Sequence, residues 1–213
     1  FGRGGNDSIN GGEDDDILLG DAGADFLNGG AGTDRAAYWT AGSGVIADLL
    51  VAQVNTGDAA GDVFNGIENL QGSNFNDDLR GDGLSNVLWG NKGDDILHGR
   101  QGEDTLFGGD GDDILLSGAG TDVLDGGAGR DRAAYWTAPG RITADLAFSQ
   151  FGTGEAAGDT YSGIEDLQGT GFGDDLRGDA SNNRIWGGNG GDILYGRAGN
   201  DVLFGQNGDD RLR

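Results

Sequence analysis

The sequence predicts an all-β fold: a parallel β-solenoid of nonapeptide repeats, interrupted by two insert segments. Three observations lead to this prediction. A nine-residue pattern of glycines, acids and aliphatic residues recurs along most of the chain, as in Gly108–Leu116 (GGDGDDILL). Glycine accounts for 47 of the 213 residues and proline for only one. The formal net charge is −24, so a compact fold of this chain has to withstand strong self-repulsion.

The repeats keep a strict register. Counted with Gly108 as position 1, sixteen nonapeptides fall into three blocks, with four in residues 2–37, seven in 72–134 and five in 169–213. Position 1 is glycine in fifteen of them, with Ser117 as the exception, and position 4 is glycine in eleven. Position 8 is leucine or isoleucine in fourteen. A disordered glycine-rich linker has no reason to keep these registers, so the blocks are predicted to be structured.

The residue type at each position predicts how one repeat folds. Glycines at positions 1, 2 and 4 permit positive φ and close backbone approach, which predicts a tight turn over positions 1–6. Positions 7–9 are predicted to form a short strand whose middle residue points inward. Two nonapeptides then make one coil, so repeats n and n+2 stack as parallel strands and place Leu97 beside Leu115. Such a thin core buries little apolar surface, and a further stabilising interaction is needed.

The acids at position 6 are the candidates for that interaction. Stacking of repeats n and n+2 brings Asp95 beside Asp113 and Asp104 beside Asp122, and these like charges repel unless they are neutralised. A hard divalent cation would remove the repulsion, and backbone carbonyls of the turn could complete a cage of about six to eight oxygen ligands. Calcium suits such a cage better than magnesium. Zinc prefers nitrogen or sulfur ligands, and the chain has one histidine and no cysteine.

The candidate calcium ligands therefore share position 6 of the repeat or its equivalent. They are Asp7, Asp16, Asp25, Asp34, Glu68, Asp77, Asn86, Asp95, Asp104, Asp113, Asp122, Asp131, Glu165, Asp174, Asn183, Asp192, Asp201 and Asp210. The candidate carbonyl ligands come from position 4: Gly5, Gly23, Gly93, Gly102, Gly111, Gly120, Gly190 and Gly199. Pairing repeats n and n+2 gives two, five and three pairs in the blocks. The two glutamate pairs described below raise the prediction to about twelve calcium ions.

The pattern G-G-x-G-x-D-x-U-x, read in Gly108–Leu116, resembles the RTX, or haemolysin-type, calcium-binding repeats. Full repeats of this kind cover about two thirds of the chain. The resemblance implies a right-handed parallel β-roll with calcium in its turns. It also implies a secreted bacterial protein that is exported unfolded by a type I system.

The two insert segments, residues 38–71 and 135–168, are 34 residues long and belong to a larger repeat of 97 residues. The end of the first insert, Val63–Gln71 (VFNGIENLQ), keeps the nine-residue spacing and places Glu68 at position 6. Serralysin-type β-rolls contain a similar I-E-N segment whose glutamate binds calcium opposite an asparagine. By this resemblance, Glu68 is implied to share an ion with Asn86. The second copy repeats the arrangement with Glu165 and Asn183.

The remaining parts of the inserts, residues 38–62 and 135–159, are expected to be true insertions that contain strands within 44–50 and 140–147. Whether their acids bind further calcium is left open; those of the first insert are Asp48, Asp58 and Asp62. Each insert also begins beside an aromatic cluster, which either caps the roll where alanine replaces leucine, the favoured interpretation, or forms a carbohydrate-stacking platform. These clusters are Arg35/Tyr38/Trp39 and Arg132/Tyr135/Trp136.

Outward positions 7 and 9 carry more apolar residues than an exposed sheet usually does, which predicts covered faces. The most apolar of these positions hold Trp89, Phe107, Leu116, Trp186 and Phe204. The cover could be the chain's own inserts, a second copy of the chain or another domain. His98 lies in such a row and is expected to be an ordinary outward side chain.

Charge and composition exclude several functions. The net charge of −24 disfavours nucleic acid and anionic membranes as partners. No apolar run is long enough to span a bilayer, and no amino-terminal secretion signal is present. The chain starts at Phe1 inside a repeat and stops at Arg213 as another repeat completes, so we expect a fragment of a longer protein. The single histidine has no evident nucleophile beside it, and calcium-bound carboxylates leave no free general acid. We therefore expect a protein without catalytic activity.

The sequence is best explained as a calcium-binding module of a secreted protein, located outside the cell or on its surface, that folds when it meets extracellular calcium. Two alternatives remain. One is a calcium-rigidified adhesin or surface-layer assembly module. The other is a non-catalytic ancillary domain of a secreted protease or polysaccharide-active enzyme. The sequence does not identify the parent protein.

Overall fold

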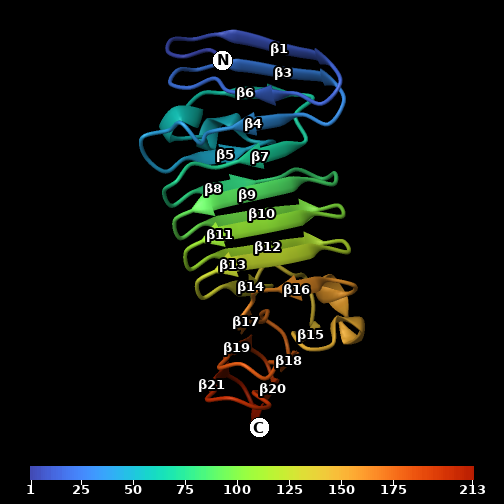
Figure 1. Ribbon diagram of the computed structural model, residues 1–213. Coiled ribbons are helices and arrows are strands. Elements are labelled where there is room, and N and C mark those ends of the chain that lie inside the picture. Colours follow the sequence, from blue (N-terminus) through green and yellow to red (C-terminus); the bar gives the residue numbers. More distant parts are fainter.

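A computed structural model describes residues 1–213 as one column of stacked parallel strands, with β1 at one end and β21 and β22 at the other (Figure 1). The elements are β1 (Ser8–Glu13), β2 (Ile17–Leu18), β3 (Phe26–Ala31), β4 (Arg35–Ala37), β5 (Ile46–Asp48), η1 (Ala52–Val54), η2 (Gly57–Ala59), β6 (Val63–Asn65), β7 (Asn69–Gln71), β8 (Asp78–Arg80), β9 (Val87–Lys92), β10 (Ile96–Gln101), β11 (Thr105–Asp110), β12 (Ile114–Ala119), β13 (Val123–Ala128), β14 (Arg132–Ala134), β15 (Thr143–Asp145), η3 (Ser149–Phe151), η4 (Gly154–Ala156), β16 (Thr160–Ser162), β17 (Asp166–Gln168), β18 (Asp175–Arg177), β19 (Arg184–Asn189), β20 (Ile193–Tyr195), β21 (Val202–Asn207) and β22 (Arg211–Leu212). The all-β parallel solenoid predicted from the sequence is confirmed.

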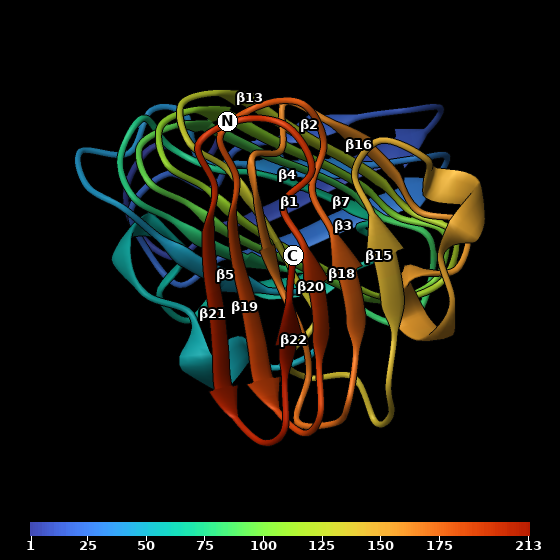
Figure 2. The same ribbon diagram turned by 90° about the horizontal axis from the view of Figure 1, so that it is seen from below.

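The strands form two faces, because successive repeats alternate between them. One face contains the sheets β1-β3-β6 and β5-β8-β10-β12-β14-β17-β19-β21, and the other contains β2-β4-β7-β9-β11-β13-β16 and β15-β18-β20-β22. All strand pairs within these sheets are parallel, as a solenoid requires. Figure 2 looks along the column and shows the short helical segments of the two inserts projecting on opposite sides.

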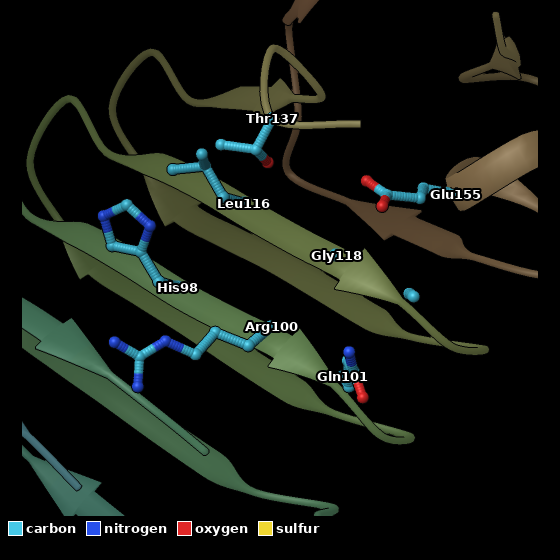
Figure 3. A pocket seen from close by; sticks show the side chains of 8 residues that line it. His98, Arg100, Gln101, Leu116, Gly118, Thr137 and Glu155 are labelled. Carbon is cyan, nitrogen blue, oxygen red and sulfur yellow. The ribbon is translucent and has the colours of Figure 1, made fainter. Parts of the chain in front are cut away.

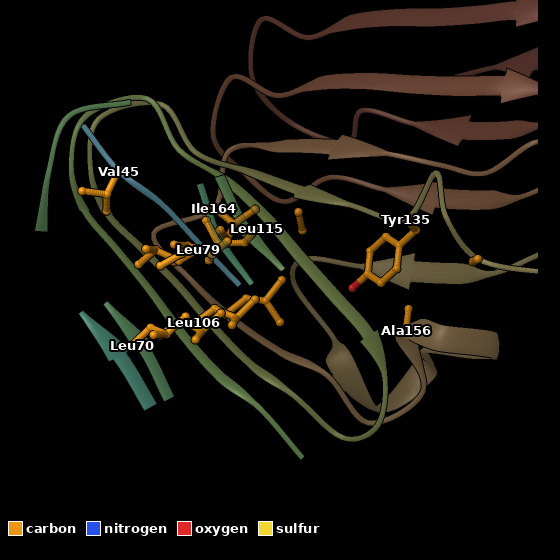
Figure 4. Packing of buried hydrophobic residues seen from close by; sticks show 14 of the residues in the cluster. Val45, Leu70, Leu79, Leu106, Leu115, Tyr135, Ala156 and Ile164 are labelled. Carbon is orange, nitrogen blue, oxygen red and sulfur yellow. The ribbon is translucent and has the colours of Figure 1, made fainter. Parts of the chain in front are cut away.

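The predicted register of repeats n and n+2 is confirmed. Leu97 of β10 lies opposite Leu115 of β12 and Leu79 of β8. On the other face, Leu106 of β11 lies between Leu88 and Leu124. These position-8 side chains are fully buried and form two facing rows, one from each face, that belong to a core cluster of 27 residues (Figure 4). The core is as thin as the sequence predicts.

The strands are longer than predicted. In the regular repeats they extend over six residues, as in β10 (Ile96–Gln101), and so include positions 1–3 of the following repeat. The reason is that backbone hydrogen bonds between coils continue past position 9; the N–H of Gly102, for example, donates to the carbonyl of Ala119 at 3.0 Å. The predicted turn over positions 1–6 is corrected in part: positions 1–3 also pair between coils, although position 2 of most repeats has the positive φ expected of a turn.

The inserts do not simply leave the coil, which corrects the expectation for residues 38–62 and 135–159. In the first insert, β5 pairs with β8, whereas β6, which comes later in the chain, pairs back with β3. The chain thus skips one position, or rung, in the stack of strands to form β5. It then reverses direction through η1 and η2 and returns as β6, which fills the skipped rung. Ala47 and Phe64 take the inward positions of these two rungs. The second insert follows the same path, with β15 on β18 and β16 on β13.

The tyrosine at the start of each insert caps the core. Tyr38 and Tyr135 are 1 % exposed, and their hydroxyls donate hydrogen bonds at 2.8 Å to Asp62 and Asp159 respectively. Of the tryptophans in the two clusters, Trp39 has the Arg35 guanidinium 5.7 Å from its ring centroid and Trp136 is 40 % exposed, so the platform interpretation stays a prediction.

Replacing Tyr38 with phenylalanine is expected to lower the free energy of unfolding by about 1–3 kcal/mol, because a buried carboxylate oxygen of Asp62 loses its donor. Urea unfolding in saturating calcium would measure this change. Tyr195→Phe is the matched control, since the Tyr195 hydroxyl makes only an exposed contact with Arg213 and its loss should cost less than about 0.5 kcal/mol. Equal losses in the two variants would contradict the assigned role of Tyr38.

The apolar outer rows are covered in part by the chain itself. Leu116 is 3 % exposed, and its strand β12 packs against η4 of the second insert. Figure 3 shows the neighbouring depression of about 430 Å³, where Thr137 and Glu155 of the insert and the strand residues His98 and Leu116 share the lining. His98 points outward as expected and lies 3.6 Å from Asp78.

The outer rows that contain Trp89 and Trp186 are covered in part by stacking between neighbouring aromatic rings. The ring of Trp89 stacks on Phe107, and that of Trp186 on Phe204, with centroids 6.1 and 5.5 Å apart. Phe204 nevertheless remains 41 % exposed.

No helix in the structure is long and apolar enough to cross a membrane.

Candidate metal sites

The acids at position 6 stack in two columns, one at each edge of the coil. The backbone N–H of Asp95 donates to Oδ1 of Asp113 at 2.8 Å, and that of Asp104 donates to Oδ1 of Asp122 at 2.8 Å. The same bond joins Asp7 to Asp25, Asp16 to Asp34, Asp77 to Asp95, Asn86 to Asp104, Asp113 to Asp131, Asp174 to Asp192, Asn183 to Asp201 and Asp192 to Asp210. The ten pairs predicted within the blocks are therefore neighbours in the structure.

The second carboxylate oxygen of most of these acids is buried without a hydrogen-bond donor. This is true of Oδ2 in Asp7, Asp16, Asp25, Asp34, Asp95, Asp104, Asp113, Asp122, Asp131 and Asp192. A buried carboxylate oxygen without a partner is costly, and such atoms are rare in folded proteins. Ten of them arranged in two columns indicate that the fold is completed by a cation.

Backbone oxygens converge on the same places. A side chain at Gly90 would collide with Oδ2 of Asp95 and with the carbonyl oxygen of Gly108 on the next coil. Position 1 is therefore glycine because two acceptor oxygens lie where a Cβ would be, and not because of its φ angle. Oδ2 of Asp95, which has no donor, thus meets a carbonyl oxygen of the next coil, and such a set of oxygens is the environment that a hard cation such as calcium requires.

The position-4 carbonyls predicted as ligands also lie beside the acids. A Cβ at Gly23 would collide with the carbonyl of Gly5 and would lie 3.2 Å from Oδ1 of Asp25. The carbonyl of Gly102 stands in the same relation to Asp122. A Cβ on the next coil would likewise collide with the carbonyls of Gly93, Gly111 and Gly190. No three acidic or histidine side chains are grouped to hold a metal, so carbonyls would have to complete the cage.

Burial and neighbouring charge raise the pKa of several of these acids. Burial is the main cause of the rise in the pKa of Asp95 to about 8, and the carboxylates of Asp77 and Asp113 add to it. The pKa values of Asp104 and Asp131 rise to about 7, again mainly through burial. Each of these acids would therefore be stabilised in its charged form by a cation placed between the coils.

The acids of the inserts divide into two groups. Asp48 is buried and receives two hydrogen bonds from the Arg100 guanidinium at 2.9 and 2.6 Å. Burial alone would raise the pKa of Asp48, but the bonds from Arg100 and from the backbone outweigh burial and lower it. Asp145 and Arg197 form the same pair in the second copy. An arginine thus provides the positive charge at Asp48, which answers the question the sequence left open for that residue.

Asp62 and Asp159 belong to the columns, and the sequence analysis did not assign them there. The N–H of Asp25 donates to Asp62 at 2.9 Å, and that of Asp122 donates to Asp159 at 3.0 Å. Burial is the main cause that raises their pKa values to about 6 and about 7. A glycine stands five residues before each acid (Gly57 and Gly154), as at position 1 of a repeat, but position 4 is alanine. The available signal was the order acid, outward residue, inward aromatic, as in Asp62–Phe64, which matches positions 6–8.

The structure also brings both glutamates into the columns. The carboxylate of Glu68 accepts from the N–H of Asp34 at 2.8 Å, and that of Glu165 accepts from the N–H of Asp131 at 3.0 Å. The side-chain amide of Asn86 donates to the carbonyl oxygen of Glu68 at 2.7 Å, as Asn183 does to Glu165 at 2.8 Å. The predicted partners are therefore adjacent, and their role as calcium ligands stays a prediction.

Comparison with known proteins identifies the repeats. The model of the RTX calcium-binding nonapeptide repeat family matches residues 1–36, 62–97, 71–106, 80–115, 98–133, 159–194, 168–203 and 186–213. The unmatched stretches coincide with the inserts, and the matches resume at the two acids that the inserts return to the columns, Asp62 and Asp159. No curated protein matches the chain. The match extends over well more than half of the chain, which therefore belongs to the family of RTX calcium-binding nonapeptide repeats.

Proposed function

We propose that this RTX β-roll, a calcium-binding module, serves as the calcium-triggered folding unit of a secreted bacterial protein. At the low calcium concentration of the cytosol the chain would be unfolded and could pass through a type I export channel. Outside the cell, calcium would fold it. The observation that carries the proposal is the two columns of buried carboxylates whose Oδ2 atoms lack a donor.

The energetics support this proposal. Extracellular calcium modules bind calcium with dissociation constants of about 0.1–1 mM. At a free calcium concentration ten times the dissociation constant, each site adds about 1.4 kcal/mol to the stability of the folded state. Twelve independent sites would add about 17 kcal/mol and six would add about 8 kcal/mol, compared with about 5–15 kcal/mol for the net stability of a typical domain. Calcium would then decide whether the chain is folded.

The composition fits an export route that requires an unfolded chain. The net charge of −24 opposes collapse when no cation is bound, and the absence of cysteine means that no disulfide can lock the chain before export. The core is one layer formed by two facing rows of leucines, too thin to fold this glycine-rich chain on its own. These features favour a location outside the cell or on its surface.

The test is far-UV circular dichroism during a calcium titration of protein from which metal ions have been removed, with magnesium as the control. We expect a cooperative gain of β-sheet signal with calcium and little gain with magnesium at the same concentration, because the carbonyl-rich cage does not offer the octahedron that magnesium requires. A β-sheet spectrum that persists without calcium would show that the core alone supports the fold, and the proposal would fail.

A second function, a calcium-set assembly or adhesion module, is favoured by the tips of the inserts. Phe148, just before η3, and Phe151, its last residue, are 50 % and 52 % exposed. Leu50, next to η1 in the first insert, is 62 % exposed. These tips project on opposite sides of the column (Figure 2). Sedimentation velocity with and without calcium separates the two functions: calcium-dependent association supports assembly, and a monomer at all concentrations supports the folding unit alone.

A further inference from the structure

The sixteen turns adopt two backbone conformations. In twelve of them the residue at position 2 has positive φ: Arg3, Gly12, Asp21, Gly30, Asn91, Arg100, Gly109, Gly118, Gly127, Gly188, Arg197 and Gln206. In the other four, position 2 is Ser73, Asp82, Thr170 or Asp179, and none of these has positive φ. Turns of the first kind, twelve in number, are called open turns, and the other four are called closed turns. The closed turns are the first two after each insert, so both copies of the 97-residue repeat place them identically.

The two conformations treat the position-6 side chain differently. All ten buried Oδ2 atoms without a donor belong to open turns. In a closed turn the N–H of position 2 points inward and donates to the position-6 side chain four residues later. Ser73 donates to Asp77 at 2.6 Å and Thr170 to Asp174 at 2.7 Å. Asp82 and Asp179 donate to Asn86 and Asn183 at 2.8 and 2.9 Å.

Asp77 illustrates how completely a closed turn satisfies its acid. Its Oδ2 accepts from the N–H of Ser73, and its Oδ1 accepts from the Ser73 hydroxyl at 2.9 Å and from the N–H of Val45 at 2.7 Å. Val45, from the first insert, takes position 6 on the rung below, so no acid faces Asp77 from that side. In the second copy, the N–H of Ile142 donates to Asp174 at 2.8 Å in the same way.

Asn86 completes its turn as both acceptor and donor. Its Oδ1 accepts from the N–H of Asp82, while its Nδ2 donates to the carbonyl of Glu68 at 2.7 Å and to Oδ1 of Asp82 at 3.3 Å. An aspartate here would bring a second carboxylate against that of Asp82. The Asn86 amide therefore supplies a hydrogen-bond donor, whereas an ionised aspartate, which only accepts, would need a positive ion at this place. Asn183 makes the same bonds to Asp179 and Glu165.

Resting on the proposed function, we propose that calcium binds only between open turns and that the four closed turns are metal-free rungs completed by the chain's own N–H donors. Six of the twelve predicted pairs contain a closed turn and would hold no ion: Glu68/Asn86, Asp77/Asp95, Asn86/Asp104, Glu165/Asn183, Asp174/Asp192 and Asn183/Asp201. Calcium then forms separate arrays, and each array is interrupted beside an insert.

Protein contacts replace the ion in these stretches. The Arg100 guanidinium pairs with the buried Asp48 on the rung that β5 adds, next to the closed turns, and also donates to the carbonyl of Gly81. The Tyr38 hydroxyl satisfies Asp62 on the rung before. Each insert, where the chain reverses its order of stacking, is thus held by hydrogen bonds and an arginine.

The test compares the number of bound calcium ions in two isosteric variants, Asp77→Asn in a closed turn and Asp113→Asn in an open one. Calcium per chain is measured by equilibrium dialysis at saturating calcium followed by atomic emission, and circular dichroism verifies that each variant is folded. We expect Asp77→Asn to bind as many ions as the parent chain and Asp113→Asn to bind at least one fewer.

Loss of ions from Asp77→Asn equal to that from Asp113→Asn would overturn the inference and leave the proposed function standing. If Asp113→Asn kept every ion, the open turns would not be the calcium sites, and both proposals would fail. Asp174→Asn carries the same expectation as Asp77→Asn in the second copy, so the test does not depend on the folding of one variant.

Discussion

Replacing Gly99 with alanine is expected to lower the free energy of unfolding in calcium by about 3 kcal/mol, the upper part of the range for overpacking a tight site. The new methyl group would collide with Oδ2 of Asp104 and with the carbonyl oxygen of Ser117 on the next coil. The carbonyl oxygen belongs to the backbone and cannot move without separating the coils, and the Asp104 carboxylate is held through its Oδ1, which accepts from the N–H of Asn86. Because both are also candidate calcium ligands, the calcium concentration at the folding midpoint should rise.

Gly83→Ala is the matched control. Nothing lies within 4 Å of a Cβ at Gly83, and its φ is not positive. Its replacement should leave the stability unchanged within about 0.5 kcal/mol, or raise it slightly because alanine restricts the unfolded chain. Urea unfolding at saturating calcium and a calcium titration would measure both variants. Similar losses in the two would mean that close approach of oxygens is not what requires glycine at position 1.

The strict nine-residue period explains why so much of the fold could be predicted. Once Leu97 and Leu115 are assigned to the interior, parallel stacking fixes Asp95 against Asp113, and the structure shows both contacts. A shift of one residue would turn every leucine outward and bury a charged or polar side chain, so the pattern permits only one register.

The path of the inserts could not be predicted in this way. The local sequence of residues 38–62 does not indicate that β5 lies beyond β6 in the column. That order depends on the distant strands with which they pair, β8 for β5 and β3 for β6. Asp62 was missed for that reason. The closed turns did leave a signal in the sequence: position 4 holds Phe75, Leu84, Phe172 or Ser181 where most repeats have glycine. That signal concerned the backbone of the turn, whereas the ligand prediction considered only the side chain at position 6.

Lowering the pH from 8 to 5 is expected to increase the β-sheet content of the calcium-free chain. Burial, reinforced by neighbouring carboxylates, raises the pKa of Asp95 to about 8 and the pKa values of Asp104 and Asp131 to about 7. The pKa of Asp113 rises to about 6 for the same main reason. In the unfolded chain these groups titrate near 4. The folded chain therefore binds protons that the unfolded chain releases.

The sign of the effect follows from this difference. Below about pH 4 the acids are protonated in both states and impose no penalty on folding. As the pH rises through 6 to 8, the folded state must ionise buried carboxylates that lie against one another, and stability is lost. A proton on each acid thus takes over part of the task proposed for calcium. Calcium-loaded protein should behave in the opposite way, because protons compete with calcium for the same oxygens and raise the calcium midpoint as the pH falls.

Circular dichroism between pH 5 and 8 would test this prediction in buffers from which calcium has been removed by a resin, since chelators lose affinity for calcium in acid. The lower limit of pH 5 stays above the isoelectric point of about 4.1, where the chain would precipitate. Asp95→Asn removes the acid with the highest pKa and should make the calcium-free chain more structured at pH 8. A calcium-free spectrum that does not change with pH would mean that repulsion within the acid columns is not what keeps the chain unfolded, and that calcium acts by ordering the carbonyls of the turns instead.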